Sequence, residues 1–453
     1  MTALNTIVTL LSDKIWFVLM ILLVGSGVLF SVRTRFVQVR RFGHAWHRVF
    51  GTLTLFGDKA EKEGMSSFQA LATAIAAQVG TGNIAGCASA LISGGPGAIF
   101  WMWLAAFFGM ATIYAEAIMA QITRKKDEDG QVIGGPVYYI QEAFHGKFGR
   151  FLAAFFSVSI ILALGLMGNM VQSNSISDAF YSAFGWNRLV VGAGVAVIAG
   201  FIFIGGISRI AQVTEKIVPV MAFLYLFGGV VCLFINRANL LPAITSIFVG
   251  AFQPQAVLGA GIGITVRQAM RYGVARGLFS NEAGMGSTPH AHAMAKVDKP
   301  QQQGEVAMIG VFFDTFVVLT MTALIVLSSG ELGEMVRSGI TGTPVVQRAV
   351  GMAFGKNLGA AFIAIALLFF AFSTIISWFF FAKQNMLYLF GKKAVKPFAV
   401  LVVLMIVLGA TLKVELVWNM ADLFNAVMVF PNLLALLMLS GRVAKLCKEA
   451  DQK

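Results

Sequence analysis

Apolar runs of membrane-spanning length recur along the whole chain, and they restrict its fold more than any other feature. A spanning α-helix needs about 20 predominantly apolar residues, and stretches such as 98–122 and 355–382 meet that requirement. The 453 residues are 58% hydrophobic and only 12% charged, a balance that excludes a soluble domain of this length. We therefore predict an all-α integral membrane protein.

The pattern predicts eleven transmembrane helices. In chain order they cover 15–32, 67–92, 98–122, 151–175, 188–206, 213–235, a discontinuous segment ending near 297, 304–329, 355–382, 395–411 and 417–440. Residues 33–66 are basic, aromatic and amphipathic, which is typical of a segment lying on a membrane surface. The short stretches 136–145 and 344–354 are predicted to be surface or vestibule helices.

The distribution of basic residues predicts the orientation. With the N-terminus outside and the C-terminus in the cytoplasm, 24 of the 34 Lys and Arg residues fall in cytoplasmic segments. An excess of basic residues on that side is what the positive-inside rule expects. The net charge of +13 is therefore a topology signal and an attraction to anionic membrane lipid rather than a nucleic-acid surface. We predict a multi-pass protein of the plasma membrane, in bacteria the inner membrane.

A polar interruption, Gln78–Asn83, lies inside the apolar stretch from Phe68 to Ile92. Its two glycines, threonine and asparagine are poor helix formers. A helix that breaks at membrane depth must be buried in protein or line a watery cavity, and it places free N–H and C=O groups and two half-helix dipoles at one point. Such a point suits a zwitterion and a cation. The alternative is a glycine-rich crossing of closely packed helices.

A second interruption, Phe279–Ser287, has similar glycine, asparagine and hydroxyl chemistry and adds the carboxylate of Glu282. Ionisable residues at membrane depth are costly and usually functional. The alternative is that Glu282 pairs with Arg276 or Arg271 and only holds the segment together. The arginines near this break, with Arg267, are predicted to lie in an outer vestibule.

The two breaks occupy matching places. With the first span set aside, ten remain, and the breaks fall in spans one and six of a five-plus-five arrangement. Interrupted helices at matching positions of two inverted halves indicate a transporter site at the repeat interface. We predict an N-terminal helix and basic loop in 1–64, a first repeat in 65–236, an inverted second repeat in 237–440 and a cytoplasmic tail in 441–453.

A pair of hydroxyl residues, Ser373 and Thr374, lies in the eighth of these ten spans. Hydroxyls in membrane helices often bond only to the preceding turn. Two hydroxyls together with carbonyls freed by a broken helix would also supply the oxygen ligands that a hard cation needs. Trp378 follows Thr374 by four residues, on about the same face, and would line a pocket or a packed interface.

Three motifs give the chain a specific resemblance: AAQVGTGNIAG (76–86), GGPVYYI (134–140) and GLFSNEAGMGSTPHAHA (277–293). Together they resemble the alanine or glycine:cation symporters, also called sodium:alanine symporters, of the amino acid–polyamine–organocation superfamily. The likeness covers nearly the whole chain. It implies the inverted-repeat fold of the bacterial leucine transporter, preceded by one extra helix.

The resemblance also implies residue roles. The carbonyls of Ala76 and Val79 would bind sodium together with the hydroxyls of Ser373 and Thr374. The implied substrate site comprises Gln78, Gly80, Thr81, Gly82, Asn83, Gln172, Phe279, Ser280, Asn281 and Trp378. In it the N–H groups of Thr81 and Gly82 hold a carboxylate, and a carbonyl at Phe279 or Ser280 receives an ammonium. Asn83 braces the first break or binds a second cation, although Gln78 replaces a small residue of the leucine transporters and puts a second sodium site in doubt.

The expected function is sodium-coupled import of a small neutral amino acid, alanine or glycine, by alternating access. Coupling to protons through Glu282 is the competing version, and an ion channel is a further alternative. No enzyme is expected, because His290 and His292 point in different directions on a helix and lack ligand partners. No cofactor is expected beyond the transported sodium ion. The expected partners are the amino acid, sodium and lipid, and the sequence leaves the oligomeric state open, with a monomer as one option.

Overall fold

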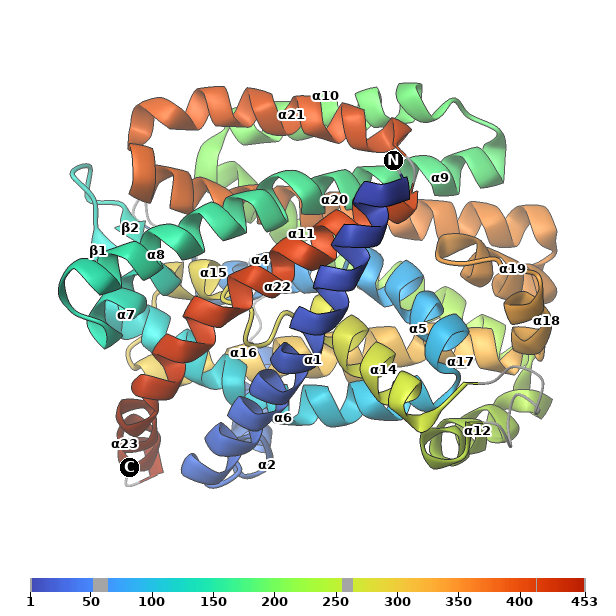
Figure 1. Cartoon of the computed structure of the whole chain (residues 1–453), viewed down its shortest axis with the longest axis horizontal. Helices are drawn as coiled ribbons and strands as arrows, with labels where there is room; N and C mark the ends of the chain where they lie inside the picture. The colour runs from blue at the N-terminus through green and yellow to red at the C-terminus, as the bar shows by residue number, and fades with distance from the viewer. Residues whose placement is uncertain (1, 52–63, 255–263, 413, 452–453) are drawn as a thin grey trace.

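The computed structural model describes residues 2–51, 64–254, 264–412 and 414–451. Nearly all of its regular structure is helical, as predicted (Figure 1). The first half contains α1 (Thr2–Arg33), α2 (Val37–Arg40), α3 (Phe42–Trp46), η1 (His47–Gly51), α4 (Ser67–Gln78), η2 (Gly82–Gly86), α5 (Cys87–Gly94), α6 (Gly97–Thr123), β1 (Lys125–Lys126), β2 (Val132–Ile133), α7 (Pro136–Ala143), α8 (Gly146–Ile160), η3 (Ile161–Gly168), α9 (Asn169–Phe184), α10 (Arg188–Ile204) and α11 (Gly206–Ile235).

The second half follows the same helical pattern. It contains η4 (Arg237–Asn239), α12 (Leu240–Phe252), α14 (Val266–Asn281), α15 (Pro289–Met294), α16 (Pro300–Phe312), η5 (Phe313–Leu319), α17 (Thr320–Ser328), α18 (Leu332–Arg337), α19 (Thr343–Phe354), α20 (Lys356–Phe390), η6 (Lys392–Ala394), α21 (Val395–Thr411), α22 (Val414–Met438) and α23 (Ser440–Asp451). The short antiparallel ribbon β1–β2 was not expected from the sequence.

Seven helices within the described residues are long and apolar enough to span a membrane, and the bent pair α4 with η2–α5 makes eight. Three shorter apolar helices, Val18–Arg33, Arg188–Ile204 and Arg237–Phe252, also occur. The predicted spans 15–32 and 188–206 coincide with two of these, and the discontinuous seventh span corresponds to α14 and α15. The count of eleven stays a prediction.

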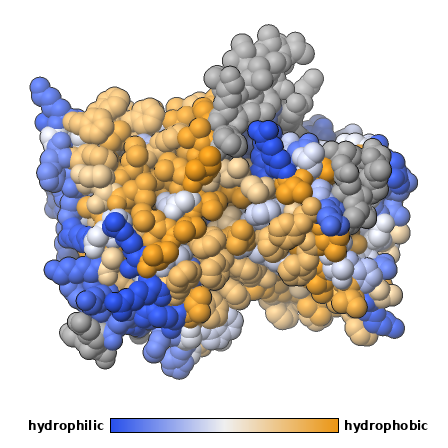
Figure 2. Space-filling view, turned by 60° about the horizontal axis from the view of Figure 1, so that its bottom comes forward, coloured by the Kyte–Doolittle hydropathy of each residue, from blue (hydrophilic) through white to orange (hydrophobic). Residues whose placement is uncertain are grey.

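The surface agrees with a membrane setting. Hydrophobic residues fill the middle of the molecule, and hydrophilic residues gather toward its two ends (Figure 2). The ribbon β1–β2, α7 and α23 lie at one end, and α18 and α19 lie at the other (Figure 1). The long helices run between these ends, and large apolar side chains on their outer faces are exposed, among them Phe201, Ile204 and Phe223. In a bilayer such side chains contact lipid tails.

Local sequence signals explain where the two interrupted helices begin. Ser66 and Gln69 form a reciprocal capping box at the start of α4, and Thr265 and Gln268 form another at the start of α14. Each box satisfies two N–H groups that the first helical turn would leave free. Proline at the first turn of α15 and α16 fits helix starts for the complementary reason that it has no N–H to satisfy.

Both predicted breaks are present. Helix α4 ends at Gln78, the chain turns by 45°, and the helix resumes at Gly82 with a π-helical turn, η2. Helix α14 ends at Asn281, where Glu282 adopts a left-handed backbone with φ of 58°. A non-glycine residue in this region is uncommon and often marks a functional segment. Positive φ at Gly284 and Gly286 completes the irregular stretch before α15.

Candidate functional site

The two breaks meet in the interior. A Cβ atom on Gly82 would lie only 3.0 Å from Cα of Ser280, so the second break approaches the first at main-chain distance. A side chain at this position would press against the main chain of Ser280, so glycine suits the approach. The Gln78 side chain donates to the carbonyl of Asn281 at 2.8 Å, which joins the end of α4 to the end of α14. The sequence-predicted residues on both breaks are therefore brought together.

Asn83 braces the first break from within. Its side-chain oxygen accepts a hydrogen bond from the N–H of Gly80 at 3.0 Å. This bond helps to replace the acceptor that a regular helix would provide. Its side-chain NH₂ donates to the Asp314 carboxylate at 2.6 Å. These two hydrogen bonds fit the bracing role expected for Asn83.

Gln172, on α9, faces the first break as expected. Its side-chain oxygen accepts the N–H of Thr81 at 3.2 Å. That N–H is one of the two assigned by resemblance to a substrate carboxylate. The amide oxygen of Gln172 therefore stands where one oxygen of such a carboxylate would lie, and a bound carboxylate would displace it.

The hydroxyl pair faces the end of α4. Thr374 donates to the carbonyl of Ala76 at 2.8 Å, and Ser373 lies 3.4 Å from the same carbonyl oxygen. Both hydroxyls also lie within 3.0 Å of the carbonyl of Phe370 on their own helix. The distances therefore also fit the alternative, in which the hydroxyls bond only to the preceding turn. Val79 is the buried C-cap of α4, and no hydrogen bond among the described residues joins it to the hydroxyl pair.

Aromatic rings surround the second break. The ring of Phe279 meets Trp378 edge to face, with centroids 6.1 Å apart, and lies 5.1 Å from Trp418. Trp378 and Phe279 are buried. The described side chains around the meeting point of the breaks are thus bulky, and a ligand seated among them would be small.

The alternative paired Glu282 with Arg276 or Arg271, and the structure does not pair it with Arg276. Its carboxylate accepts hydrogen bonds from the Trp378 indole at 2.6 Å and from the Ser287 hydroxyl. Arg276 instead forms a two-pronged ion pair with Asp422 on α22, at 2.9 and 2.8 Å. The arginine lies 5.1 Å from the Trp418 ring, so it covers the aromatic cluster.

The sequence analysis missed Asp314, on the π-helical segment η5. The carboxylate is fully buried and accepts hydrogen bonds from Asn83, Ser280 and Thr315. All three donors are neutral, and no ion pair to Asp314 occurs among the described residues. π-Helical turns inside α-helices are frequent at functional sites. A carboxylate in the apolar run 304–329 was the available signal, by the rule already applied to Glu282.

Glu116, on α6, is a second buried carboxylate that the sequence analysis missed. Its two oxygens accept the N–H groups of Gly284 and Gly286 at 3.0 and 2.9 Å. Asn432 on α22 donates to the same carboxylate at 2.7 Å. Glu116 therefore satisfies main-chain donors of the irregular stretch between α14 and α15, which would otherwise be buried without partners.

The histidines on α15 serve neighbouring main chain and side chains. A His290 ring nitrogen lies 2.7 Å from the carbonyl of Ser287, and the other lies 2.8 Å from the Asn385 amide. His292 contacts the Gln303 amide at 2.8 Å. No group of three or more metal-binding side chains occurs in the described part of the chain.

Comparison with known proteins supplies the context for this geometry. The profile of the Sodium:alanine symporter family matches residues 1–453. The chain is 40% identical to the sodium/alanine symporter AgcS of Methanococcus maripaludis, over 96% of this chain and 94% of that protein. It is 38% identical to the amino-acid carrier protein AlsT of Bacillus subtilis, over 98% of this chain and 92% of that protein.

Solved structures share the fold. The crystal structure of MhsT in complex with L-phenylalanine superposes with a TM-score of 0.59 and 13% identity, over 86% of this chain and 99% of that one. A manganese transporter of Eremococcus coleocola superposes with a TM-score of 0.54 and 12% identity, over 86% and 81% of the two chains. At such low identity the likeness concerns architecture alone. The match of the family profile to the full chain and the relatives near 40% identity establish that this protein belongs to the sodium:alanine symporter family.

Proposed function

We propose that this multi-pass membrane protein is a symporter that couples import of a small neutral amino acid, alanine or glycine, to sodium by alternating access. The observation that carries the proposal is the main-chain contact between the two broken helices at Gly82 and Ser280. Half-helix ends that converge in an apolar interior favour a zwitterion without any fixed charge. The family and the relatives named for sodium and alanine support the same function.

The substrate carboxylate binds at the start of η2. The N–H groups of Thr81 and Gly82 lie at the N-terminal end of η2, and the positive end of a helix dipole favours an anion. The Gln172 oxygen leaves the Thr81 N–H when a carboxylate arrives, and its own amide NH₂ then remains available to the ligand. Carbonyls at the end of α14, near Phe279 and Ser280, receive the ammonium. The rings of Phe279 and Trp378 limit the side chain to about a methyl group.

Sodium, the co-transported substrate, binds between α4 and α20. The carbonyls of Ala76 and Val79 and the hydroxyls of Ser373 and Thr374 are its ligands. A sodium ion here exchanges the 2.8 Å hydrogen bond from Thr374 to Ala76 for two oxygen–cation contacts. Because Ala76 belongs to the last turn before the break, the ion fixes the break in its binding form. Amino acid affinity therefore rises with sodium, and sodium affinity rises equally with amino acid.

The proposed cycle uses the ten-helix inverted repeat with its extra N-terminal helix, the N-terminus being outside. A four-helix bundle that contains both breaks, one from each repeat, rocks against the remaining helices and exposes the site to each side in turn. A positive charge that enters across 100 mV gains about 2.3 kcal/mol, so the membrane potential adds to the sodium gradient.

Proton coupling is the second candidate, and one observation favours it. Asp314 lies between both breaks with neutral donors only, and a buried carboxylate in that setting either holds a proton or attracts a cation. The Glu282 carboxylate likewise accepts hydrogen bonds from neutral donors, Ser287 and Trp378.

Counterflow of labelled alanine in proteoliposomes separates the two candidates. At fixed pH, replacing sodium by potassium abolishes uptake if sodium is the coupling ion. Uptake that ignores sodium and follows the pH gradient would instead assign the coupling to protons. Saturation with alanine distinguishes either symporter from a channel.

A further inference from the structure

A pocket rich in basic residues lies where α1 meets the C-terminal helix α23. It has a volume of about 290 Å³, and its wall includes the cations Arg33, Arg35, Arg40, Lys445 and Lys448 with one acid, Asp451. Among the described residues, Asp451 pairs with Arg40, and no ion pair is formed by the other four cations. Five cations around one small volume repel one another, so the pocket favours an anion with several acceptor oxygens.

An exposed apolar stripe leads away from this pocket along α1. Ile21, Gly25, Val28 and Val32 follow one another at intervals of three or four residues, so they share one face of the helix. Ile21, Val28 and Val32 are 61%, 39% and 59% exposed. The stripe ends at Val32, directly before the cations Arg33 and Arg35 of the basic pocket. A charged pocket continuous with an apolar track fits an amphiphile and not a soluble phosphate.

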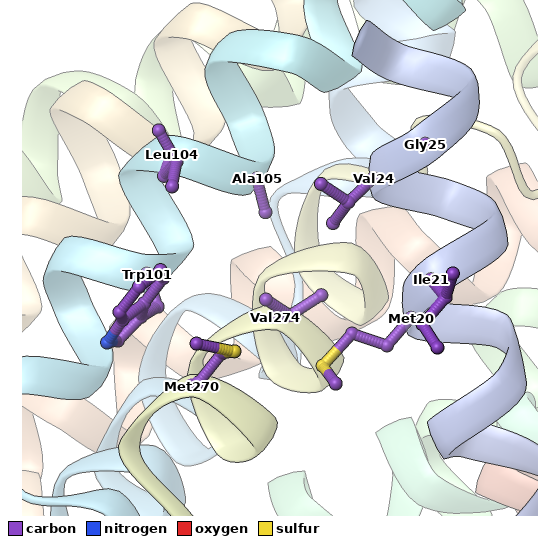
Figure 3. Close-up of a pocket in the computed structure, with 9 residues that line it drawn as sticks. All are labelled: Met20, Ile21, Val24, Gly25, Trp101, Leu104, Ala105, Met270 and Val274. Carbon is purple, nitrogen blue, oxygen red and sulfur yellow. The ribbon is translucent and has the colours of Figure 1, made fainter. Parts of the chain in front are cut away.

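The other end of the stripe enters a second, apolar pocket. This pocket, of about 270 Å³, lies between α1, α6 and α14 and is lined by Ile21 and Gly25 together with Trp101, Leu104, Met270 and Val274 (Figure 3). Figure 3 shows side chains from all three helices directed toward the space between them. Its lining is almost wholly apolar, which suits a hydrocarbon chain.

The two pockets are one lipid tail apart. Half of a bilayer hydrocarbon core is about 15 Å thick, which corresponds to about ten residues of α-helix. Ten residues before Arg35 is Gly25, at the edge of the apolar pocket. The spacing along α1 therefore matches the length of one acyl chain within its leaflet.

We propose that these features form a binding site for one anionic phospholipid of the leaflet on the side of α23, the cytoplasmic leaflet in the predicted orientation. The phosphate lies among Arg33, Arg35, Lys445 and Lys448. One acyl chain follows the stripe on α1 and ends against Met270 and Val274 of α14. Because α14 also carries Phe279 and Ser280, the bound chain touches the helix that bears the second break.

The headgroup is tested by titrating the purified full-length protein in detergent and counting bound lipids by native mass spectrometry. The probes are phosphatidylglycerol, phosphatidylcholine with the same chains, and glycerol phosphate without chains. Phosphatidylglycerol binds tightest, and the double variant R35Q/K448Q weakens it by about fivefold for each charge removed. The matched control K393Q/K396Q removes two exposed cations outside the pocket and leaves the affinity unchanged.

Equal binding of phosphatidylglycerol and phosphatidylcholine overturns the proposal, and so does an equal loss in the control variant. Glycerol phosphate that binds as tightly as phosphatidylglycerol would make the pocket a site for free phosphate and not for lipid. Gel filtration and the thermal midpoint confirm that each variant is folded before its affinity is compared.

The acyl chain is tested through Trp101, which lines the apolar pocket. Phosphatidylglycerol brominated near the ends of its chains quenches tryptophan fluorescence with a saturable component at the affinity found by mass spectrometry. The Trp101→Phe variant loses that component and keeps the affinity. An unchanged saturable component in this variant overturns the placement of the chain.

Discussion

The hydroxyl of Thr374 donates to the main-chain carbonyl of Ala76, 298 residues away in sequence, at 2.8 Å. This contact joins the middle of α20 to the last turn of α4, directly before the first break. The break and the hydroxyl pair therefore form one structural unit, in which a change at either partner alters the other.

Thr374→Val tests the proposed cation site. Valine keeps the shape and removes one oxygen ligand, and the loss of a charge-assisted contact of about 1.5–3 kcal/mol weakens sodium affinity by about tenfold or more. Alanine uptake in saturating sodium recovers, because the substrate contacts remain. Sodium dependence of counterflow measures the change. Ser377→Ala is the matched control, since its buried hydroxyl on the same helix has no hydrogen-bond partner in the described part of the chain. Unaltered sodium affinity in the Thr374→Val variant would remove this hydroxyl from the site.

Gly82→Ala tests the contact between the breaks. The added methyl group would lie 3.0 Å from Cα of Ser280 and 3.2 Å from its Cβ, so the two breaks must shift apart by a few tenths of an ångström. We expect uptake to fall by at least tenfold while the protein still folds, as judged by gel filtration. Gly86→Ala is the control, because its Cβ would meet the carbonyl of Thr81 at an ordinary 3.8 Å. Full activity of the Gly82→Ala variant would refute the close approach as a requirement for transport.

Glu282→Gln separates sodium coupling from proton coupling through this residue. A glutamine side chain still accepts from the Trp378 indole, and the Ser287 hydroxyl can accept from the new NH₂ group. Under sodium coupling, we expect uptake to persist with less than about a tenfold loss and with its sodium dependence intact. Complete loss of coupled uptake, with counterflow preserved, would assign the coupling proton to Glu282.

The ion pair between Arg276 and Asp422 should be measurable as a coupling energy. Both side chains are mostly buried, and the two-pronged geometry is favourable. A double-mutant cycle with Arg276→Gln and Asp422→Asn should give about 1–3 kcal/mol of interaction, read from unfolding midpoints. The exposed pair Arg337 and Glu334 should give a much smaller coupling energy in the same assay, because water screens it. Equal coupling energies for both pairs would contradict this ranking.

The stability that α23 gains from its contact with the segment after α1 should depend on pH. The hydrogen bond from Arg40 lowers the pKa of Asp451 below its usual value, and Arg41 adds to the effect. Since the folded pKa is the lower one, the stabilisation is present above the unfolded value of about 3.9 and is lost as pH falls through the folded pKa. We expect a few tenths of a kcal/mol, because the pair is partly exposed. Thermal midpoints of wild type and Asp451→Asn between pH 6 and pH 3 should converge at the acidic end. A constant difference would exclude this linkage.

The sequence by itself determined the features that depend on neighbouring residues. Apolar length predicts spanning helices, and glycine with asparagine or a hydroxyl residue predicts where a helix breaks, because both follow from local backbone energetics. The breaks at Gly80–Asn83 and Ser280–Gly284 could therefore be predicted from the residues themselves. Family motifs added the roles expected of Ala76, Thr374 and Gln172, which no local rule contains.

Only the tertiary structure decided which polar groups satisfy one another. Asp314 lies 231 residues from Asn83, and Asn432 lies 316 residues from Glu116, yet each pair shares a hydrogen bond. No periodicity encodes such a pairing. It arises because each main-chain group freed by a break must find a partner in an interior without water, and the available partner depends on which helices pack beside it.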